Sequence, residues 1–313
     1  MSEPLFLKSV MQEKIWGGTK LRDVFGYEIP SDKVGEYWAI SAHPHGVSTI
    51  KNGRFADQGL DQLYAEHREL FGNRPEPVFP LLTKILDAND WLSVQVHPDD
   101  AYGLAHEGEL GKTECWYVIA ADEGAEIIYG HNAKSKDELR QQIESKDWEH
   151  LLTKVPVKAG DFFYVPSGTM HAIGSGILIL ETQQSSDTTY RVYDFDRKDD
   201  QGNLRELHLE KSIDVLNIGE PANSRPVTLK ADDLESILLV ANDFFAVYKW
   251  EITGNVHFEK RADYSLVSVL AGQGELTVDG QTYDLGKGDH FILPSDVTEW
   301  TFSGDLELIV SHP

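Results

Sequence analysis

The chain has 313 residues, a length that suggests two domains or one elaborated domain. Its 41% hydrophobic and 10% aromatic residues are typical of folded globular proteins and exclude a disordered or fibrous chain. The formal net charge of −24 disfavours binding to nucleic acid or to anionic membrane surfaces.

Most of the sequence consists of short alternating apolar runs bounded by Gly, Pro, Asp and Asn, a pattern typical of antiparallel sandwiches and barrels. Three segments predict helices: residues 57–72, 135–155 and 206–219. The second of them opens with a capping box, because Ser135 precedes Glu138 by three positions. We therefore expect a mainly β fold with a few connecting helices.

An internal repeat divides the chain. GDFFYVPSGTMHAI (160–173) and GDHFILPSDVTEWTF (288–302) share Gly-Asp, four strand residues and Pro-Ser. Between them, the prolines and small polar residues of 220–228 predict a linker. We therefore expect two related β units, an N-terminal domain of residues 1–220 and a C-terminal domain of residues 221–313. Only the first copy combines a carboxylate at a strand start with a histidine at a strand end, so the second is predicted to be scaffold.

The segment SVQVHPDD (93–100) places Gln95 and His97 two positions apart at the end of a predicted strand. Side chains with this spacing point to the same side of a strand, which is suitable geometry for metal ligands. A polar strand face with a solvated histidine would have the same pattern. Two further residues favour a site: Glu114 opens an apolar, aromatic strand, and His171 follows a Pro-Ser-Gly turn.

The spacing G-x5-P-x-G-x2-H that ends at His171 resembles the second motif of the cupin superfamily, although Gly174 replaces the usual Asn. Cupins are small double-stranded β-helix barrels that hold a divalent metal on inward-facing residues. Within that superfamily the chain resembles the short type I mannose-6-phosphate isomerases. The matching segments are KIWGGTKL (14–21), GEYWAISAHP (35–44), KILDANDWLSVQVHPDD (84–100), GKTECWYV (111–118), VPSGTMHAIG (165–174) and ETQQSSDTTYRVYDFDR (181–197).

The resemblance implies one Zn²⁺ per chain, held by four residues: Gln95, His97, Glu114 and His171. Imidazole and carboxylate suit zinc, and a single carboxylate leaves the site positive and Lewis acidic. Because four ligands would close a tetrahedral site, catalysis requires an expanded coordination shell or a displaceable water. The implied reaction is the zinc-dependent interconversion of D-mannose 6-phosphate and D-fructose 6-phosphate through a cis-enediol.

Aldose–ketose isomerisation requires proton transfer between C1 and C2, stabilisation of the enediolate and capture of the phosphate. By resemblance, Arg191 and Lys112 are the catalytic side chains; Lys112, Glu181 and a zinc-bound hydroxide are alternatives for the general base. The resemblance places four more residues in the substrate pocket: Lys84, Ser93, Glu181 and Asp187. Lys84 and Ser93 are the candidates for phosphate contact.

Other features favour simpler interpretations. His43 and His45 have the spacing of a metal pair, but the proline between them disfavours a regular strand, and the family does not use them. The acidic run 194–203 is typical of a solvated turn. The single cysteine, Cys115, is predicted to be in the core and suits a reducing compartment. With no secretory signal and no apolar run near the roughly 20 residues that cross a bilayer, we expect a cytoplasmic protein.

Two other classes of protein remain as alternatives. A cupin dioxygenase would also use imidazole and carboxylate ligands, but it requires iron and open coordination positions. A non-catalytic sugar-binding cupin would have the same fold, because fold does not determine function. The sequence leaves the oligomeric state open.

Overall fold

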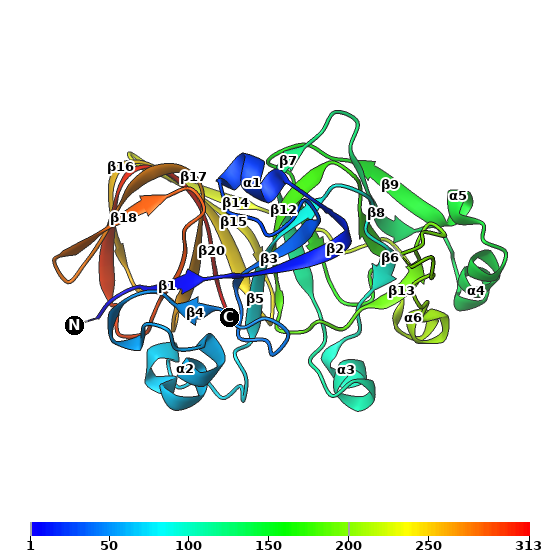
Figure 1. Ribbon diagram of the computed structural model, residues 1–313, viewed down its shortest axis with the longest axis horizontal. Coiled ribbons are helices and arrows are strands. Elements are labelled where there is room, and N and C mark those ends of the chain that lie inside the picture. The colour runs from blue at the N-terminus through cyan, green and yellow to red at the C-terminus, as the bar shows by residue number, and fades with distance from the viewer. Residues whose placement is uncertain (1, 200) are drawn as a thin grey trace.

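The computed structural model describes residues 2–199 and 201–313, whose strands form three sheets (Figure 1). The first sheet has the order β10 (Phe162–Val165), β7 (Glu114–Ala121), β12 (Ile177–Gln184), β5 (Leu81–Ala88), β3 (Val34–Ile40) and β2 (Val10–Gly18). The second has the order β13 (Tyr190–Tyr193), β6 (Val94–Val96), β11 (His171–Ile173), β8 (Glu126–His131) and β9 (Leu152–Pro156). One core cluster joins residues of both sheets, which are therefore two walls of one unit.

The third sheet belongs mainly to the C-terminal part of the chain. Its order is β14 (Val227–Ala231), β15 (Leu234–Ala241), β16 (Ala246–Glu259), β20 (Glu299–His312), β17 (Ser265–Val278), β19 (His290–Leu293), β1 (Leu5–Lys8) and β4 (Thr49–Ile50), with β18 (Gln281–Gly286) paired to β17. It curls into a second β unit beside the first (Figure 1). Because β1 and β4 come from the start of the chain, the N-terminal segment helps to complete the C-terminal unit.

A hydrophobic core lies between the two units. Strand β12 is buried along its whole length because each of its faces meets a different partner. Ile179 points into the first unit, whereas Leu178 and Leu180 join a cluster that also contains Phe245 and Ile309 of the C-terminal sheet. The mainly β architecture of two packed units confirms the expected fold class.

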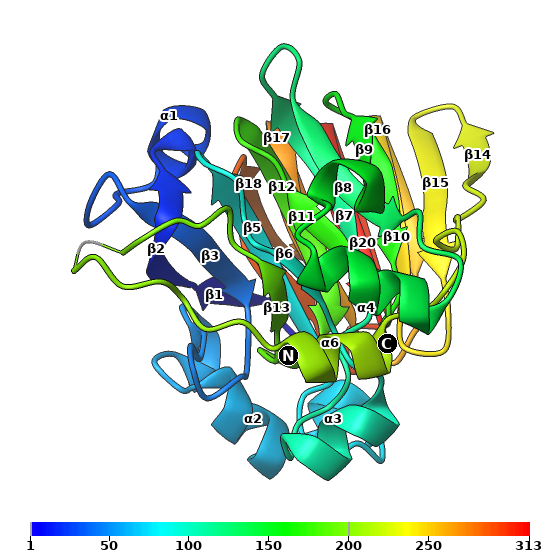
Figure 2. The same ribbon diagram turned by 90° about the vertical axis from the view of Figure 1, so that its right-hand side faces the viewer.

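The helices are short. Two of them, α4 and α6, pack against one face of the second sheet and lie in front of it in Figure 2. They are α1 (Lys20–Phe25), α2 (Leu60–Glu66), α3 (Asp100–His106), α4 (Lys136–Glu144), α5 (Trp148–Leu151) and α6 (Leu209–Val215), with 3₁₀ turns η1 (Gly53–Phe55) and η2 (Arg68–Phe71). Within residues 2–199 and 201–313, no helix is long and apolar enough to cross a membrane.

The three predicted helices are present, but each is shorter than expected. Residues 57–72 form α2 and η2, separated at His67, and residues 206–219 are helical only in α6. The prediction for 135–155 was wrong at its end, because residues 152–156 form β9 and pair with β8. Lys146, with φ of 57°, breaks the helix between α4 and α5. The Ser135 half of the predicted capping box is confirmed, since Glu138 N–H donates to Ser135 Oγ over 3.1 Å. The Glu138 carboxylate accepts its hydrogen bond from Lys134 N–H, one residue before the expected donor.

Candidate metal centre and pocket

Strand β6 is the centre of the candidate site. Its Gln95 lies opposite His171 of β11 on one side and opposite Arg191 of β13 on the other. His97 follows one residue after the strand ends and accepts a backbone hydrogen bond from Gly168, in the turn before β11. The register of three short strands therefore gathers side chains that are up to 96 positions apart in the sequence.

The four predicted metal ligands converge on one point. Glu114, at the start of β7, places Oε2 3.4 Å from His97 Nε2 and Oε1 3.3 Å from His171 Nε2. The Gln95 amide lies 3.3 Å from the same His171 nitrogen. The ligand atoms of the two imidazoles and the carboxylate all lie within 4.8 Å of one another, and all three side chains are buried.

The hydrogen bonds around this cluster leave its lone pairs free for a cation. The Nδ1 atoms of His97 and His171 donate to the carbonyl oxygens of Thr188 and Thr169, each over 2.9 Å, which directs both Nε2 lone pairs inward. His97 Nε2 and Glu114 Oε2 are buried without any hydrogen-bond partner among the described residues. Such orphaned acceptors need a partner, and a divalent metal such as zinc fits them.

The charge states also suit a metal site. Burial lowers the pKa of His97 to about 3, so this imidazole is neutral near pH 7. Burial acts to raise the pKa of Glu114, but the neighbouring Lys112 ammonium opposes it, and that pKa lies well below its usual range. Two neutral imidazoles and one carboxylate are a common donor set for zinc.

The opposite wall of the site is a row across the first sheet. Lys84 of β5 lies opposite Glu181 of β12, which lies opposite Trp116 of β7. The Trp116 indole N–H lies 3.1 Å from both Glu114 Oε1 and Glu181 Oε1, so one donor links the metal cluster to this wall. Burial and the nearby Glu114 raise the pKa of Glu181 to about 7.

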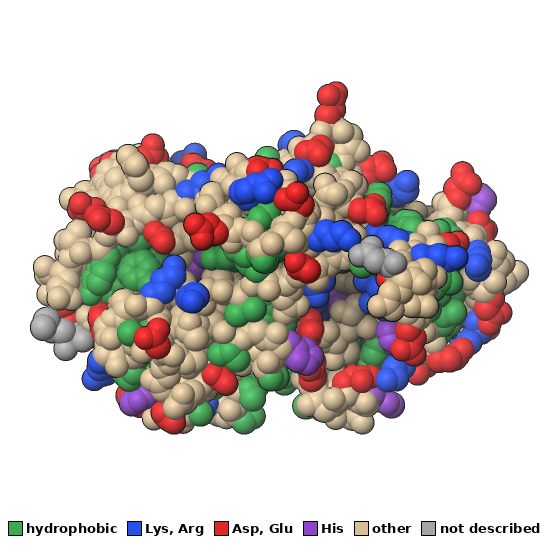
Figure 3. Space-filling view, viewed as in Figure 1, with side chains coloured by type: hydrophobic (Ala, Val, Ile, Leu, Met, Phe, Trp, Pro, Cys, Tyr) green, Lys and Arg blue, Asp and Glu red, His purple; other side chains and the backbone are tan. Residues whose placement is uncertain are grey.

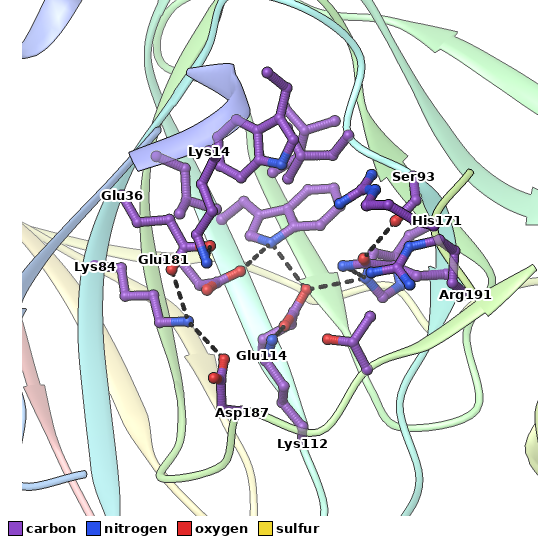
Figure 4. A pocket seen from close by; sticks show the side chains of 18 residues that line it. Lys14, Glu36, Lys84, Ser93, Lys112, Glu114, His171, Glu181, Asp187 and Arg191 are labelled. Atoms are coloured by element: carbon purple, nitrogen blue, oxygen red, sulfur yellow. Dashed lines mark hydrogen bonds and ion pairs between the residues drawn. The ribbon is translucent and has the colours of Figure 1, made fainter. Parts of the chain in front are cut away.

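A cavity of about 300 Å³ lies between the two walls (Figure 4). Nine of the ten residues predicted for the site line it: Lys84, Ser93, Gln95, Lys112, Glu114, His171, Glu181, Asp187 and Arg191. The tenth, His97, completes the cluster against Glu114. The space-filling view shows a hollow in this half of the molecule, with Lys and Arg side chains at its rim (Figure 3). The structure therefore brings all ten residues together, while their individual roles remain predictions.

The cavity also contains residues that sequence reasoning did not select. The carboxylate of Glu36, on β3, lies 3.3 Å from Lys14 and 3.5 Å from Lys84, and it accepts a 2.6 Å hydrogen bond from the Trp38 indole. The Lys84 ammonium also lies 4.5 Å from the Trp38 ring centroid. Glu36 and Trp38 fall within the segment 35–44 that carries the family resemblance, so the signal was present but not assigned to the pocket.

The two histidines of the AHPHG segment take part in contacts at the pocket rim. His45 Nδ1 lies 2.9 Å from Asp187, and His43 lies 3.4 Å from Glu109. Asp187 in turn lies 4.0 Å from Lys84. These contacts give His45 a role in holding Asp187 at the pocket.

Two facing sheets that enclose a buried imidazole–carboxylate cluster define a cupin with a ligand set suited to a divalent metal. Its polar cavity opens beside that cluster, as in a protein that binds a small hydrophilic molecule.

Comparison with known proteins identifies the family. The model for the catalytic domain of type I phosphomannose isomerase matches residues 5–123, and the cupin domain of mannose-6-phosphate isomerase matches residues 235–313. A mannose-6-phosphate isomerase of Streptococcus mutans is 71% identical over 312 residues, 100% of this chain and 99% of that protein. The crystal structure of mannose 6-phosphate isomerase from Bacillus subtilis has a TM-score of 0.97 at 50% identity, with 100% of both chains covered. The chain belongs to the type I phosphomannose isomerase family.

More distant members share the fold alone. A phosphomannose isomerase variant from Salmonella typhimurium is 15% identical and has a TM-score of 0.82, with 99% of each chain covered. The two-unit architecture is therefore retained at low sequence identity.

Proposed function

We propose that the protein is a zinc-dependent isomerase that interconverts D-mannose 6-phosphate and D-fructose 6-phosphate through a cis-enediol. The observation that carries the proposal is the buried cluster of His97, Glu114 and His171, whose inward lone pairs face a polar cavity. Membership of the type I phosphomannose isomerase family supports the same reaction. A cytoplasmic location is part of the proposal, because a single cysteine suits a reducing compartment.

We assign one zinc ion per chain to Gln95, His97, Glu114 and His171. Bound there, zinc would supply Lewis acidity that polarises the oxygen atoms at C1 and C2 of the sugar. Gln95 can present its amide oxygen to the cluster by a half-turn of the side-chain amide, since the two amide atoms differ little in shape.

Lys112 and Arg191 are the proposed catalytic side chains. The Lys112 ammonium lies 3.5 Å from Glu114 Oε2, so it borders the metal cluster. Glu114 and Glu181 raise the pKa of Lys112 against the effect of burial, which keeps it a cationic donor. Arg191 lines the cavity from the strand next to Gln95. Two positioned cations can stabilise negative charge on the enediolate oxygens.

The remaining pocket residues would bind and orient the sugar. Glu181 and Asp187 provide carboxylates for sugar hydroxyls, and Lys84 and Ser93 provide donors. The buried position of Glu181 and Lys84, both 3% exposed or less, keeps these groups out of bulk water. The proposed division of the chain assigns this chemistry to residues 1–220 and a supporting role to residues 221–313.

The test compares variants of the proposed metal ligands with a variant of a proposed catalytic side chain. His97→Ala and His171→Ala should lose both bound zinc and turnover of mannose 6-phosphate. Arg191→Ala should retain zinc but lower kcat by about 10²–10⁴, the usual effect of removing one positioned catalytic group. His150→Ala, at an exposed position on α5, is the matched control and should retain both properties. Full turnover by a zinc-free His97→Ala protein would refute the proposal.

A further inference from the structure

The loop between β12 and β13 carries two groups on which the proposed site depends. Asp187 lines the cavity, and its carboxylate lies 4.0 Å from the Lys84 ammonium (Figure 4). The Thr188 carbonyl accepts the 2.9 Å hydrogen bond from His97 Nδ1, which directs the Nε2 lone pair of that imidazole into the metal cluster. The position of this loop therefore affects both the pocket and one proposed metal ligand.

A carboxylate from another loop holds this segment in place. Glu109 lies between α3 and β7, and its Oε2 atom accepts hydrogen bonds from three consecutive residues. The donors are the Ser186 hydroxyl at 3.2 Å, the Asp187 backbone N–H at 3.1 Å and the Thr188 hydroxyl at 2.9 Å. Hydrogen bonds to an ionised acceptor are stronger than those between neutral groups. One oxygen atom therefore fixes both the backbone and the side chains of the loop.

The second oxygen of Glu109 faces a buried histidine. Glu109 Oε1 lies 3.4 Å from Nε2 of His43, which is 5% exposed. His43 Nδ1 accepts a 3.2 Å hydrogen bond from the His45 backbone N–H, and burial lowers the pKa of His43. Near pH 7 this ring is therefore neutral with its proton on Nε2, facing Glu109. Because His45 also contacts Asp187, the AHPHG segment supports the loop both through Glu109 and directly.

The carboxylate is charged where these donors meet it. Burial acts to raise the pKa of Glu109, but the hydrogen bonds from Thr188 and Asp187 oppose it, and that pKa lies below its usual value. Ser186, the third donor, is fully buried. Removal of the carboxylate would leave three donors without their acceptor, and an unsatisfied buried donor is costly. The loop would then have to move to find other partners.

We propose that Glu109 is a positioning residue for both the metal and the substrate, because it fixes the loop that carries the Thr188 carbonyl and the Asp187 carboxylate. It acts on His97 through Thr188 and on the cavity through Asp187. Groups that orient a metal ligand control metal affinity in many proteins. This role rests on the proposed isomerase function and names a residue outside the cavity that controls the geometry of the site.

The experiment compares Glu109→Ala with Glu107→Ala as a matched control. The two carboxylates belong to the same loop and have similar side-chain exposures of 30% and 27%. Glu107 accepts hydrogen bonds from the Tyr190 hydroxyl and from Lys211, so its loss does not release residues 186–188. In competition with a chelator, Glu109→Ala should raise the dissociation constant of zinc by about 10-fold. Glu107→Ala should change it by less than about 3-fold.

A second measurement uses the zinc-free protein and needs no turnover. In NMR spectra of protein labelled with ¹⁵N-histidine, wild type should show His97 as the single Nδ1–H tautomer, because the Thr188 carbonyl requires a donor there. Glu109→Ala should show a mixture of this tautomer with the Nε2–H tautomer, whereas Glu107→Ala should keep the single form. A general loss of stability would not change the tautomer of the folded protein.

Kinetics and a conservative variant separate positioning from folding. At saturating zinc, Glu109→Ala should raise KM for mannose 6-phosphate by about 3- to 10-fold and change kcat less, because Asp187 is displaced. Glu109→Gln retains an oxygen atom for the same three donors. It should therefore restore the single His97 tautomer and a zinc affinity within about 3-fold of wild type.

Wild-type zinc affinity together with a single His97 tautomer in Glu109→Ala would overturn the proposal. Equal losses in Glu107→Ala would do the same. If Glu109→Ala fails to fold, Thr188→Val decides, because it removes one of the three donors and keeps the carbonyl; zinc binding should weaken by about 3-fold, and no change would overturn the proposal. If wild type shows no isomerase activity, the isomerase proposal fails separately, since the zinc and tautomer measurements require no substrate.

Discussion

A buried histidine in the C-terminal unit predicts an unusual dependence of stability on pH. His290 of β19 is 1% exposed; its Nε2 lies 3.0 Å from the Tyr27 hydroxyl, and its Nδ1 lies 2.8 Å from the Ser268 hydroxyl. The Tyr27 hydroxyl donates to the Gly288 carbonyl, so it accepts from His290, and Ser268 donates to the other ring nitrogen. These bonds satisfy the neutral imidazole. Burial, assisted by Lys51, lowers the pKa of His290 to about 3.

The sign of the effect follows from the direction of the shift. The unfolded chain binds a proton at this histidine near pH 6.5, whereas the folded protein does not until about pH 3. The stabilising contribution of the neutral His290 is therefore complete above pH 6.5 and is lost as the pH falls towards 3. Each unit below 6.5 costs about 1.4 kcal/mol, which amounts to about 2.7 kcal/mol at pH 4.5.

The assay is urea unfolding of wild type and His290→Gln between pH 7.5 and 4.5, with chelator present so that metal loss contributes to neither curve. As the pH is lowered below 6, the free energy of unfolding of wild type should fall more steeply than that of His290→Gln. The difference between the two slopes should be about 1.4 kcal/mol per pH unit. His257→Gln, at an exposed position, should follow wild type. Parallel curves for wild type and His290→Gln would refute the reasoning.

Three substitutions test other parts of the account. Glu36→Gln should lower the free energy of unfolding by about 1–3 kcal/mol, measured by urea unfolding, because it leaves the buried Lys84 ammonium without its nearest carboxylate. Gly168→Ala should weaken zinc affinity in a chelator competition. The added methyl group would clash with Asn217, and alanine is disfavoured at φ of 81°, so the substitution would distort the turn before His171. Ser135→Ala should reduce thermal stability by about 1 kcal/mol through loss of the α4 cap. Unchanged values would contradict each expectation.

Local sequence signals and the family resemblance were sufficient to select the residues that the structure gathers into one buried cluster. The spacing of Gln95 and His97 and the turn before His171 each depend on residues close together in the chain, and the resemblance links them. The repeated Gly-Asp turn also has the expected form, because Gly160 and Gly288 have φ of 88° and 93°. In both cases a short pattern determines the local backbone.

The other pocket residues and the joining of the two β units depend on contacts between distant parts of the chain. Glu36 reaches the pocket because β3 pairs with β5. Arg205 is held there by its hydrogen bonds to Asp194, the residue that directly follows β13. Arg205 carries no local pattern that distinguishes it from a surface charge, and Glu36 is marked only by its place in the segment 35–44 that carries the family resemblance. The placement of β1 beside β19 likewise joins residues almost 300 positions apart, which no local period predicts.

The most direct test of the central claim is NMR of the zinc-loaded protein with mannose 6-phosphate in D₂O, before chelation, after chelation and after zinc is restored. The account predicts that fructose 6-phosphate forms, stops forming with chelator and forms again with zinc, with deuterium incorporated at the exchanging carbon. Turnover that continues at full rate after complete removal of zinc, or no turnover by the zinc-loaded protein, would contradict it.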